Sequence, residues 1–175
     1  IMLLTELPNY IECTKVYNLH KKKINFNCIY SNSKNIVKNS IFIIENKKKF
    51  KIEYLKEAIE SVFNQSFNDW EIVFWDNIST DNSAVIASSY DDRLKYFLAH
   101  EHTELGVARN LALKKAKGKY IGFLDCDDIF LENKLKDQIA FMEKHKHVMS
   151  YGSSIIIDEN GKELKRRIAK NKSGN

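Results

Sequence analysis

A cluster of three aspartates directly after an apolar run constrains this chain more than any other feature of its sequence. Residues 120–124 (YIGFL) have the length and apolarity of a buried strand, and Asp125, Asp127 and Asp128 follow at once. Neighbouring carboxylates repel one another unless a cation or donor-rich ligand meets them, or some are protonated or face water. Mg²⁺ and Mn²⁺ prefer such oxygen ligands and complete their shells with phosphate and water. The cluster therefore indicates a metal–phosphate site, or an aspartate-rich turn that caps the following helix.

Strands and helices are predicted to alternate along the middle of the chain. This order predicts an α/β fold with a mainly parallel sheet and helices on both faces. The apolar run at 70–76 (WEIVFWD) is typical of a strand covered on both sides. The turn DENG at 158–161 predicts a hairpin whose partner strand the remaining residues hardly contain. Strands are expected at 40–44, 70–76, 93–100, 120–124 and 147–157. Helices are expected at 53–65, at 105–118 with Gly118 as the stop, and at 132–145. A further helix is expected to begin at a cap formed by Ser79, Thr80 or Asp81 and to end at about residue 90.

Acidic residues end two of the predicted strands. Asp76 closes the strand at 70–76, and the aspartate cluster closes the strand at 120–124. Because ligands bind at the carboxyl ends of strands in such sheets, we expect both loops to face one crevice. Arg109, near the start of a predicted helix, fits either a phosphate contact or a surface salt bridge. The sequence contains no Walker or dinucleotide glycine motif, so a glycine loop that binds phosphate is not predicted.

Length and composition describe about one globular domain. The 175 residues are 43% apolar and 11% aromatic, and no apolar run approaches the length of a membrane span. The first residues lack the basic flank and cleavage site of a signal peptide. The three cysteines are odd in number and widely spaced, which favours neither a disulfide framework nor a zinc site. A cytoplasmic location is the simplest expectation.

The basic residues gather at the two ends of the chain. We divide it into a Lys/Asn-rich N-terminal segment of uncertain structure at 1–39, a domain at 40–161 and a basic polar tail at 162–175. Basic ends of this kind are typical of solvated surface, and they would also allow peripheral contact with the inner face of an anionic membrane. No basic stripe with interleaved aromatic residues is visible, so no nucleic-acid partner is expected.

Two stretches of the sequence together resemble a known enzyme family. They are AIESVFNQSFNDWEIVFWDNISTDNS at 58–83 and LGVARNLALKKAKGKYIGFLDCDDIF at 105–130. They carry the patterns SV-x-NQ, D-x-x-STD-x-S, G-x-A-R-N and DxD in this order. In this the chain is similar to the nucleotide-sugar-binding half of the family 2 glycosyltransferases, which are inverting enzymes with the GT-A fold. The resemblance extends over about 41–161.

The resemblance implies a role for each residue that matches a family motif. Asp76 and Asn77 would contact the base of the nucleotide, and Arg109 would lie close to the nucleotide. Asp125 would bind the ribose or sugar side of the donor, and Asp127 would ligate Mn²⁺ or Mg²⁺ on the diphosphate. The donor would be a UDP-sugar. Its sugar would pass with inversion to a hydroxyl of a carbohydrate or lipid-linked acceptor in surface polysaccharide or glycoconjugate synthesis.

The sequence also departs from the family pattern. The only proline is Pro8, so residues 43–55 stand in place of the family's usual proline-containing first loop. Asn77 stands where a second acid often occurs, which leaves the identity of the nucleotide base open. The family's general base lies beyond the last predicted strand. No catalytic residue is therefore assigned, and we expect a domain that is incomplete at its C-terminal end. The alternative function is a truncated donor-binding module without efficient transfer. Cys126, between two acids, is expected to be a packing residue and not a nucleophile.

Overall fold

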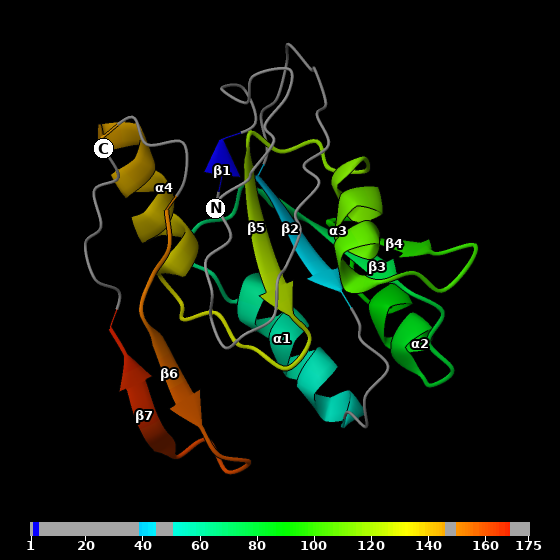
Figure 1. Cartoon of the computed structure of the whole chain (residues 1–175). Coiled ribbons are helices and arrows are strands. Elements are labelled where there is room, and N and C mark those ends of the chain that lie inside the picture. Colours follow the sequence, from blue (N-terminus) through cyan, green and yellow to red (C-terminus); the bar gives the residue numbers. More distant parts are fainter. Residues whose placement is uncertain (1, 4–38, 45–50, 146–149, 169–175) are drawn as a thin grey trace.

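The computed structural model describes residues 2–3, 39–44, 51–145 and 150–168 (Figure 1). Most of the segment predicted at 1–39, the loop at 45–50 and the end of the tail predicted at 162–175 lie outside the described residues. The described part contains a five-stranded sheet, four helices and a separate hairpin. No helix within it is long and apolar enough to cross a membrane.

Within the described residues, the larger sheet has five strands. They are β1 (Met2–Leu3), β2 (Asn39–Ile44), β3 (Trp70–Asp76), β4 (Leu94–Leu98) and β5 (Tyr120–Asp125). Their order in the sheet is β1-β5-β2-β3-β4. The four longer strands are parallel, and β1 joins β5 in the antiparallel direction. The mainly parallel sheet that the alternation predicts is therefore confirmed.

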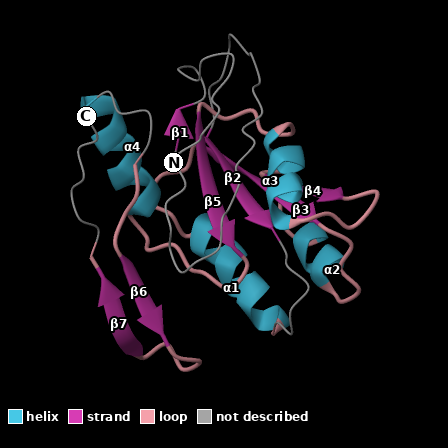
Figure 2. Ribbon diagram, in the orientation of Figure 1, coloured by secondary structure: helices cyan, strands magenta, loops and turns pink. Residues whose placement is uncertain are grey.

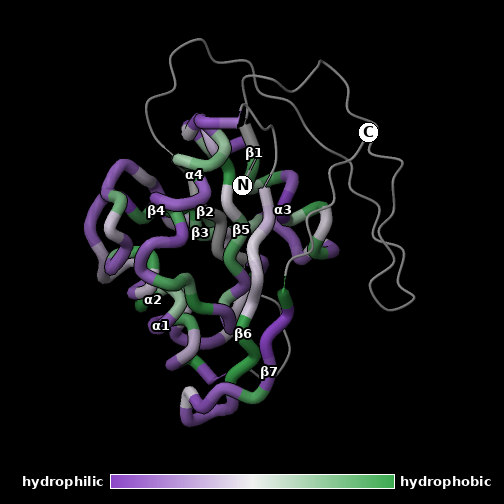
Figure 3. Tube along the Cα trace, turned by 90° about the vertical axis from the view of Figure 1, so that its left-hand side faces the viewer, coloured by the Kyte–Doolittle hydropathy of each residue, from purple (hydrophilic) through white to green (hydrophobic). Residues whose placement is uncertain are grey.

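Helices cover both faces of this sheet (Figure 2). They are α1 (Ile52–Phe63), α2 (Ser83–Ser88), α3 (Leu105–Leu113) and α4 (Lys134–His145). On one face α1, α2 and α4 pack on the strands, in a core to which α1 contributes Ala58, Ile59 and Val62. On the other face α3 packs through Ala108 and Ala112. Figure 3 shows the loops beside α2 and β4 as hydrophilic, whereas β5 is largely hydrophobic.

Every residue of β3 is buried. Successive side chains of a strand point to opposite faces of a sheet. Ile72 and Phe74 accordingly join the core under α1, whereas Val73 and Trp75 join the core under α3. The prediction that WEIVFWD is a strand covered on both faces is confirmed.

Two helices are shorter by several residues than the sequence predicts. The N-cap of α2 is Asn82 and not one of the three predicted residues, although Asp81 Oδ1 accepts the Ser83 N–H at 2.8 Å. α3 ends at Leu113 and not at Gly118. Shorter-range turns follow α3, and the Lys117 N–H then donates to the Glu71 carboxylate at 2.6 Å. This tertiary hydrogen bond takes the place of a continued helix.

The predicted hairpin is present, and its partner strand lies inside the predicted tail. β6 (Ser154–Ile157) pairs antiparallel with β7 (Glu163–Arg167), and within the described residues the two form a sheet of their own. The hairpin lies below α4 in the view of Figure 1. Its turn ends at Gly161, whose φ of 77° is in the left-handed region that glycine adopts without strain. The expectation that the chain hardly contains a partner strand is wrong.

A buried carboxylate connects β3 and β4 to the loop after α3. Glu71 is 2% exposed, and its Oε2 accepts a hydrogen bond from Lys95 Nζ at 2.6 Å. Its Oε1 accepts the Lys117 N–H. Because the carboxylate is buried and both of its oxygens are bonded, its loss removes a hydrogen bond to the Lys117 backbone and the ion pair with the partly exposed Lys95 side chain.

We expect Glu71→Ala to lower the free energy of unfolding by about 1.5–3 kcal/mol, the range for lost hydrogen bonds to a charged group, because the Lys95 side chain left behind is 37% exposed and can be solvated. Urea denaturation measures this change. The control is Glu60→Ala, which removes an exposed ion pair with Lys56 and should cost less than about 0.5 kcal/mol. Equal losses in the two variants would contradict the structural role of Glu71.

Candidate functional site

The sheet brings the two predicted acidic loops to the same edge. Ile44, the last residue of β2, pairs with Trp75 of β3 on one side and with Asp125 of β5 on the other. Asp76 therefore lies one strand beyond β2 in one direction and Asp125 one strand beyond it in the other. Two inter-strand spacings separate the backbones of these strand ends by about 10 Å.

Asp76 is held inside the protein at the end of β3. It is 1% exposed, its Oδ1 accepts the Ser79 N–H at 2.6 Å, and its Oδ2 accepts the Tyr96 hydroxyl at 2.7 Å. Tyr96 in turn stacks on Phe74. A carboxylate offers about four acceptor positions, so these two bonds fix its orientation without using all of its capacity.

Asn77 connects the loop after β3 to the loop before α3. Its Nδ2 donates to the Thr103 carbonyl at 2.7 Å, and its Oδ1 accepts the Thr103 N–H at 3.1 Å. The next residue, Ile78, has a φ of 64°, which costs a branched side chain on the order of 1–2 kcal/mol. Both residues that the family resemblance assigns to the base thus hold loops in place, and their contact with a base stays a prediction.

Arg109 of α3 contacts the aspartate cluster. Its Nη2 donates to Asp125 Oδ1 at 2.8 Å, and the guanidinium carbon lies 5.6 Å from the centre of the Phe123 ring. The side chain of Arg109 is 20% exposed and that of Asp125 is 51% exposed. The sequence leaves open whether Arg109 makes a salt bridge or meets a ligand. The structure contains the salt bridge, and it lies at the predicted site.

The aspartate cluster forms a tight turn. The Asp128 N–H donates to the Asp125 carbonyl at 3.0 Å, and Cys126 points into the core and is 5% exposed. The expected packing role of Cys126 is confirmed. Asp127 and Asp128 remain exposed on the outside of the turn. Partial desolvation, followed by the negative charges of Asp125 and Asp127, raises the pKa of Asp128 above its usual value.

The alternative that the cluster caps the following helix is wrong. α4 begins at Lys134, well beyond the turn. The N–H of Leu135, in its first turn, donates instead to Gln65 Oε1 at 3.0 Å. An isolated cap would also not account for three carboxylates side by side.

The residues of the turn fit a metal ion that phosphate helps to hold. No group of three or more His, Cys, Asp or Glu in the described ranges could hold a metal ion by itself. Within those ranges Asp127 makes no hydrogen bond or ion pair, so its carboxylate is available. Mg²⁺ commonly binds through one or two carboxylates together with substrate phosphates and water. Asp127, with Asp125 or Asp128 beside it, matches that pattern.

Several residues around the site were assigned no role from the sequence. Tyr96 orients Asp76, and Thr103 is the partner of Asn77. Gln65 and Ser61 bind the segment that follows the aspartate turn. A signal for Ser61 and Gln65 was present, because they are the first and last residues of the SV-x-NQ pattern, but their partners cannot be read from the sequence.

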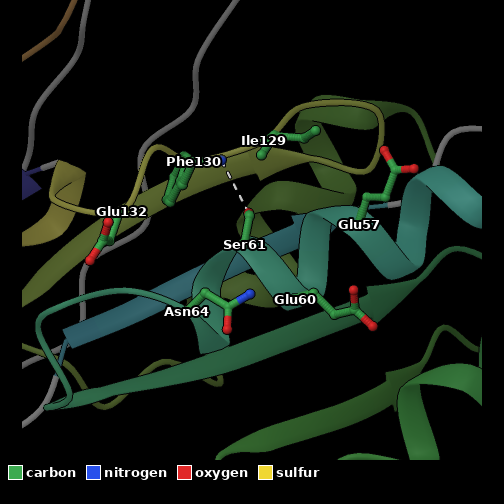
Figure 4. Close-up of a pocket in the computed structure, with 7 residues that line it drawn as sticks. All are labelled: Glu57, Glu60, Ser61, Asn64, Ile129, Phe130 and Glu132. Atoms are coloured by element: carbon green, nitrogen blue, oxygen red, sulfur yellow. Dashed lines mark hydrogen bonds between the residues drawn. The ribbon is translucent and has the colours of Figure 1, made fainter. Parts of the chain in front are cut away.

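A depression of about 600 Å³ lies between α1 and the segment after the turn (Figure 4). Glu57, Glu60 and Glu132 are among its lining residues, and none of the five predicted donor or metal residues lines it. We therefore do not assign the donor to this depression.

The raised pKa of Asp128 has a consequence for stability. The folded chain holds this proton more tightly than the unfolded chain, so Asp128 makes the fold less stable as the pH rises above the usual carboxyl pKa. In EDTA at pH 7, Asp128→Asn should raise the urea midpoint, and near pH 3 the gain should disappear.

The matched control is Asp91→Asn. A hydrogen bond from Arg93 lowers the pKa of Asp91, so the charged form of Asp91 stabilises the fold and its loss should lower the midpoint at pH 7. An unchanged or lower midpoint for Asp128→Asn at pH 7 would contradict the raised pKa of Asp128.

The chain is similar to glycosyltransferases over most of the described region. The family description "Glycosyl transferase family 2" matches residues 41–174. An uncharacterized glycosyltransferase of Rickettsia bellii is 39% identical over 128 residues, which are 71% of this chain and 18% of that protein. The Escherichia coli protein named UDP-Glc:alpha-D-GlcNAc-diphosphoundecaprenol beta-1,3-glucosyltransferase WfgD is 37% identical over 107 residues, which are 61% of this chain and 42% of that protein. The chain thus spans less than half the length of these relatives.

Solved structures show the same fold. S. aureus TarS in complex with UDP-GlcNAc matches with a TM-score of 0.56 and 31% identity, over 62% of this chain and 32% of that chain. A second match is the mannosyltransferase PcManGT from Pyrobaculum calidifontis, in complex with GDP-Man and Mn²⁺. Its TM-score is 0.51 and its identity 18%, over 71% of this chain and 37% of that chain, so it shows the shared fold alone. With a parallel sheet of the GT-A type and a family match from residue 41 to residue 174, the chain belongs to glycosyl transferase family 2.

Proposed function

We propose that this chain binds the nucleotide-sugar donor of an inverting glycosyltransferase, with a UDP-sugar as donor and Mn²⁺ or Mg²⁺ as metal. The observation that carries the proposal is the aspartate turn at the carboxyl end of β5, which pairs with Arg109 and lies across β2 from Asp76. Under this proposal, acceptor groups for a nucleoside would lie beside a charged site for a diphosphate.

Each donor residue has a task that its surroundings support. Asp76, with its orientation fixed, and Asn77 would face the base, and Asp125 would accept hydrogen bonds from the ribose or sugar. Arg109 would lie beside the diphosphate, where a guanidinium can form paired hydrogen bonds. Asp127 would hold the metal, which when bound offsets negative charge on the leaving diphosphate.

The proposed transfer is a single displacement at the anomeric carbon. An acceptor hydroxyl oxygen forms the new bond while the bond to the diphosphate oxygen breaks, and a general base takes the hydroxyl proton. We assign no residue to that base. UDP is supported as the donor nucleotide by the UDP-GlcNAc complex of TarS and by the name of WfgD.

The acceptor is proposed to be a carbohydrate or a lipid-linked saccharide. The name of WfgD includes a diphosphoundecaprenol acceptor, and that of Bacillus subtilis TuaG, which is 33% identical over 119 residues, refers to teichuronic acid biosynthesis. Both support a role in surface polysaccharide or glycoconjugate synthesis. The lysine-rich ends would favour the inner face of an anionic membrane, where a lipid-linked acceptor is presented.

One observation favours the alternative of a donor-binding module without efficient transfer. After α4, the carboxylates in the part of the chain that the structure describes are already engaged. Asp158 accepts hydrogen bonds from its own turn, Glu159 pairs with Lys51, and Glu163 pairs with Arg166. None of them is therefore poised as a general base. Release of sugar or transfer product from UDP-sugars by this chain would decide for the enzyme.

We expect Mn²⁺ to strengthen UDP binding to the native chain about tenfold or more, because Asp127 would hold the metal and the metal would offset the negative charge of the diphosphate. Isothermal titration with and without Mn²⁺ measures the ratio of the two dissociation constants. In Asp127→Ala the ratio should fall close to one. Titration of GDP and dTDP in the same format tests the choice of base.

Glu57→Ala is the matched control, because it removes an exposed carboxylate that is not among the proposed site residues. Its ratio should equal that of the native chain. Metal-independent UDP binding by the native chain, or an unchanged ratio in Asp127→Ala, would overturn the site.

A further inference from the structure

One helix end holds the segment that leaves the aspartate turn. The residues that do so, Ser61, Gln65 and Ser66, are named here the α1 clamp. They bind a run of six residues through side-chain and backbone groups. Ser61 Oγ accepts the Phe130 N–H at 3.1 Å. Gln65 binds on both sides of its amide: Nε2 donates to the Leu131 carbonyl at 2.8 Å, and Oε1 accepts the Leu135 N–H at 3.0 Å. Ser66 donates twice, from its N–H to the Glu132 carbonyl at 3.0 Å and from its Oγ to Asn133 Oδ1 at 2.7 Å.

The clamp is itself fixed by further hydrogen bonds. Gln65 is 4% exposed, and its Nε2 also donates to the Ser61 carbonyl at 2.9 Å. The Ser61 hydroxyl donates to the Ala58 carbonyl at 2.7 Å while it accepts from Phe130. Buried polar side chains whose groups are all bonded adopt one arrangement, because any other leaves a group unsatisfied.

The aspartate turn therefore lies between two anchors. On one side, Leu124 directly before the turn and Cys126 within it are buried in the core under α1. After it, Phe130 is buried in the same core and is bonded to Ser61, as the dashed line in Figure 4 shows. Residues 127–129, between Cys126 and Phe130, are exposed. The position of Asp127 thus depends on both anchors.

We propose that the α1 clamp is a positioning element for the metal and diphosphate site, with Gln65 as its central residue. The inference rests on the proposed function. A metal site requires its ligands to be held within about half an ångström, and neighbouring hydrogen bonds supply this constraint. The clamp fixes the second end of the turn, so that Asp127 meets the metal and diphosphate without first ordering the loop.

The test uses Gln65→Met, which keeps the length and apolar stem of the side chain and removes its hydrogen bonds. Tyr120→Phe is the matched control. It removes the hydroxyl that donates to Glu143, at the opposite end of the same strand and far from the aspartates. Ser61→Ala is a second, milder clamp variant if Gln65→Met folds poorly.

The first measurement is amide hydrogen exchange without ligand, followed by NMR. In Gln65→Met the Asp128 amide, which closes the turn, should exchange about tenfold faster, the order expected for the loss of a buried hydrogen-bonding group. In Tyr120→Phe the exchange rate of the Asp128 amide should stay within about twofold. The lost hydrogen bond lies far from the turn, so local opening of the turn is unchanged. Equal rates for Asp128 in Gln65→Met and the native chain would overturn the clamp.

The second measurement is the Mn²⁺-dependent gain in UDP affinity. Gln65→Met should reduce this gain at least about fivefold and leave UDP binding without metal within about twofold, as loss of a positioned ligand predicts. An unchanged gain beside faster exchange would overturn the functional role of the clamp. If the native chain shows no Mn²⁺-dependent UDP binding, the proposed function fails, while the exchange rates still decide whether the clamp holds the turn.

Discussion

Burial of β3 on both faces is the constraint on which the rest of the structure depends. Phe74 and Ile72 face α1, and Val73 and Trp75 face α3. Each such side chain contributes about 1.5–3 kcal/mol when fully buried. A shift of the strand by one residue would turn every side chain to the opposite face, so the register is fixed. That register places Asp76 at the end of the strand.

Hydrophobic patterning is sufficient to predict the sheet and most of the helices. The buried run at 70–76 and the amphipathic stretch before it give signals that depend on local order alone. Features set by tertiary contacts could not be predicted. The end of α3 is determined by a bond from Lys117 to Glu71, which lies 46 residues away. β7 carries the charged sequence ELKRR, which has no strand-like alternation, and it forms because β6 pairs with it.

The site was predictable to the same extent. The aspartate cluster and Asp76 are visible because parallel strands bring their carboxyl ends together, and this follows from fold class alone. The partners of these residues are not visible. Tyr96, 20 residues from Asp76, orients it, and Gln65, 66 residues from Leu131, binds the segment after the turn. Which polar side chains meet depends on packing angles between elements, and sequence spacing does not encode those angles.

The ion pair between Arg109 and Asp125 sets the charge balance of the turn. With all three aspartates ionised, one guanidinium leaves the turn with two uncompensated negative charges, which would repel a diphosphate. A divalent ion would cancel them. Under the proposed function, metal and nucleotide would therefore favour each other's binding. By thermodynamic linkage, the factor by which the metal tightens nucleotide binding equals the factor by which the nucleotide tightens metal binding. An empty turn would then retain little metal, and the complete site would assemble only when a nucleotide arrives.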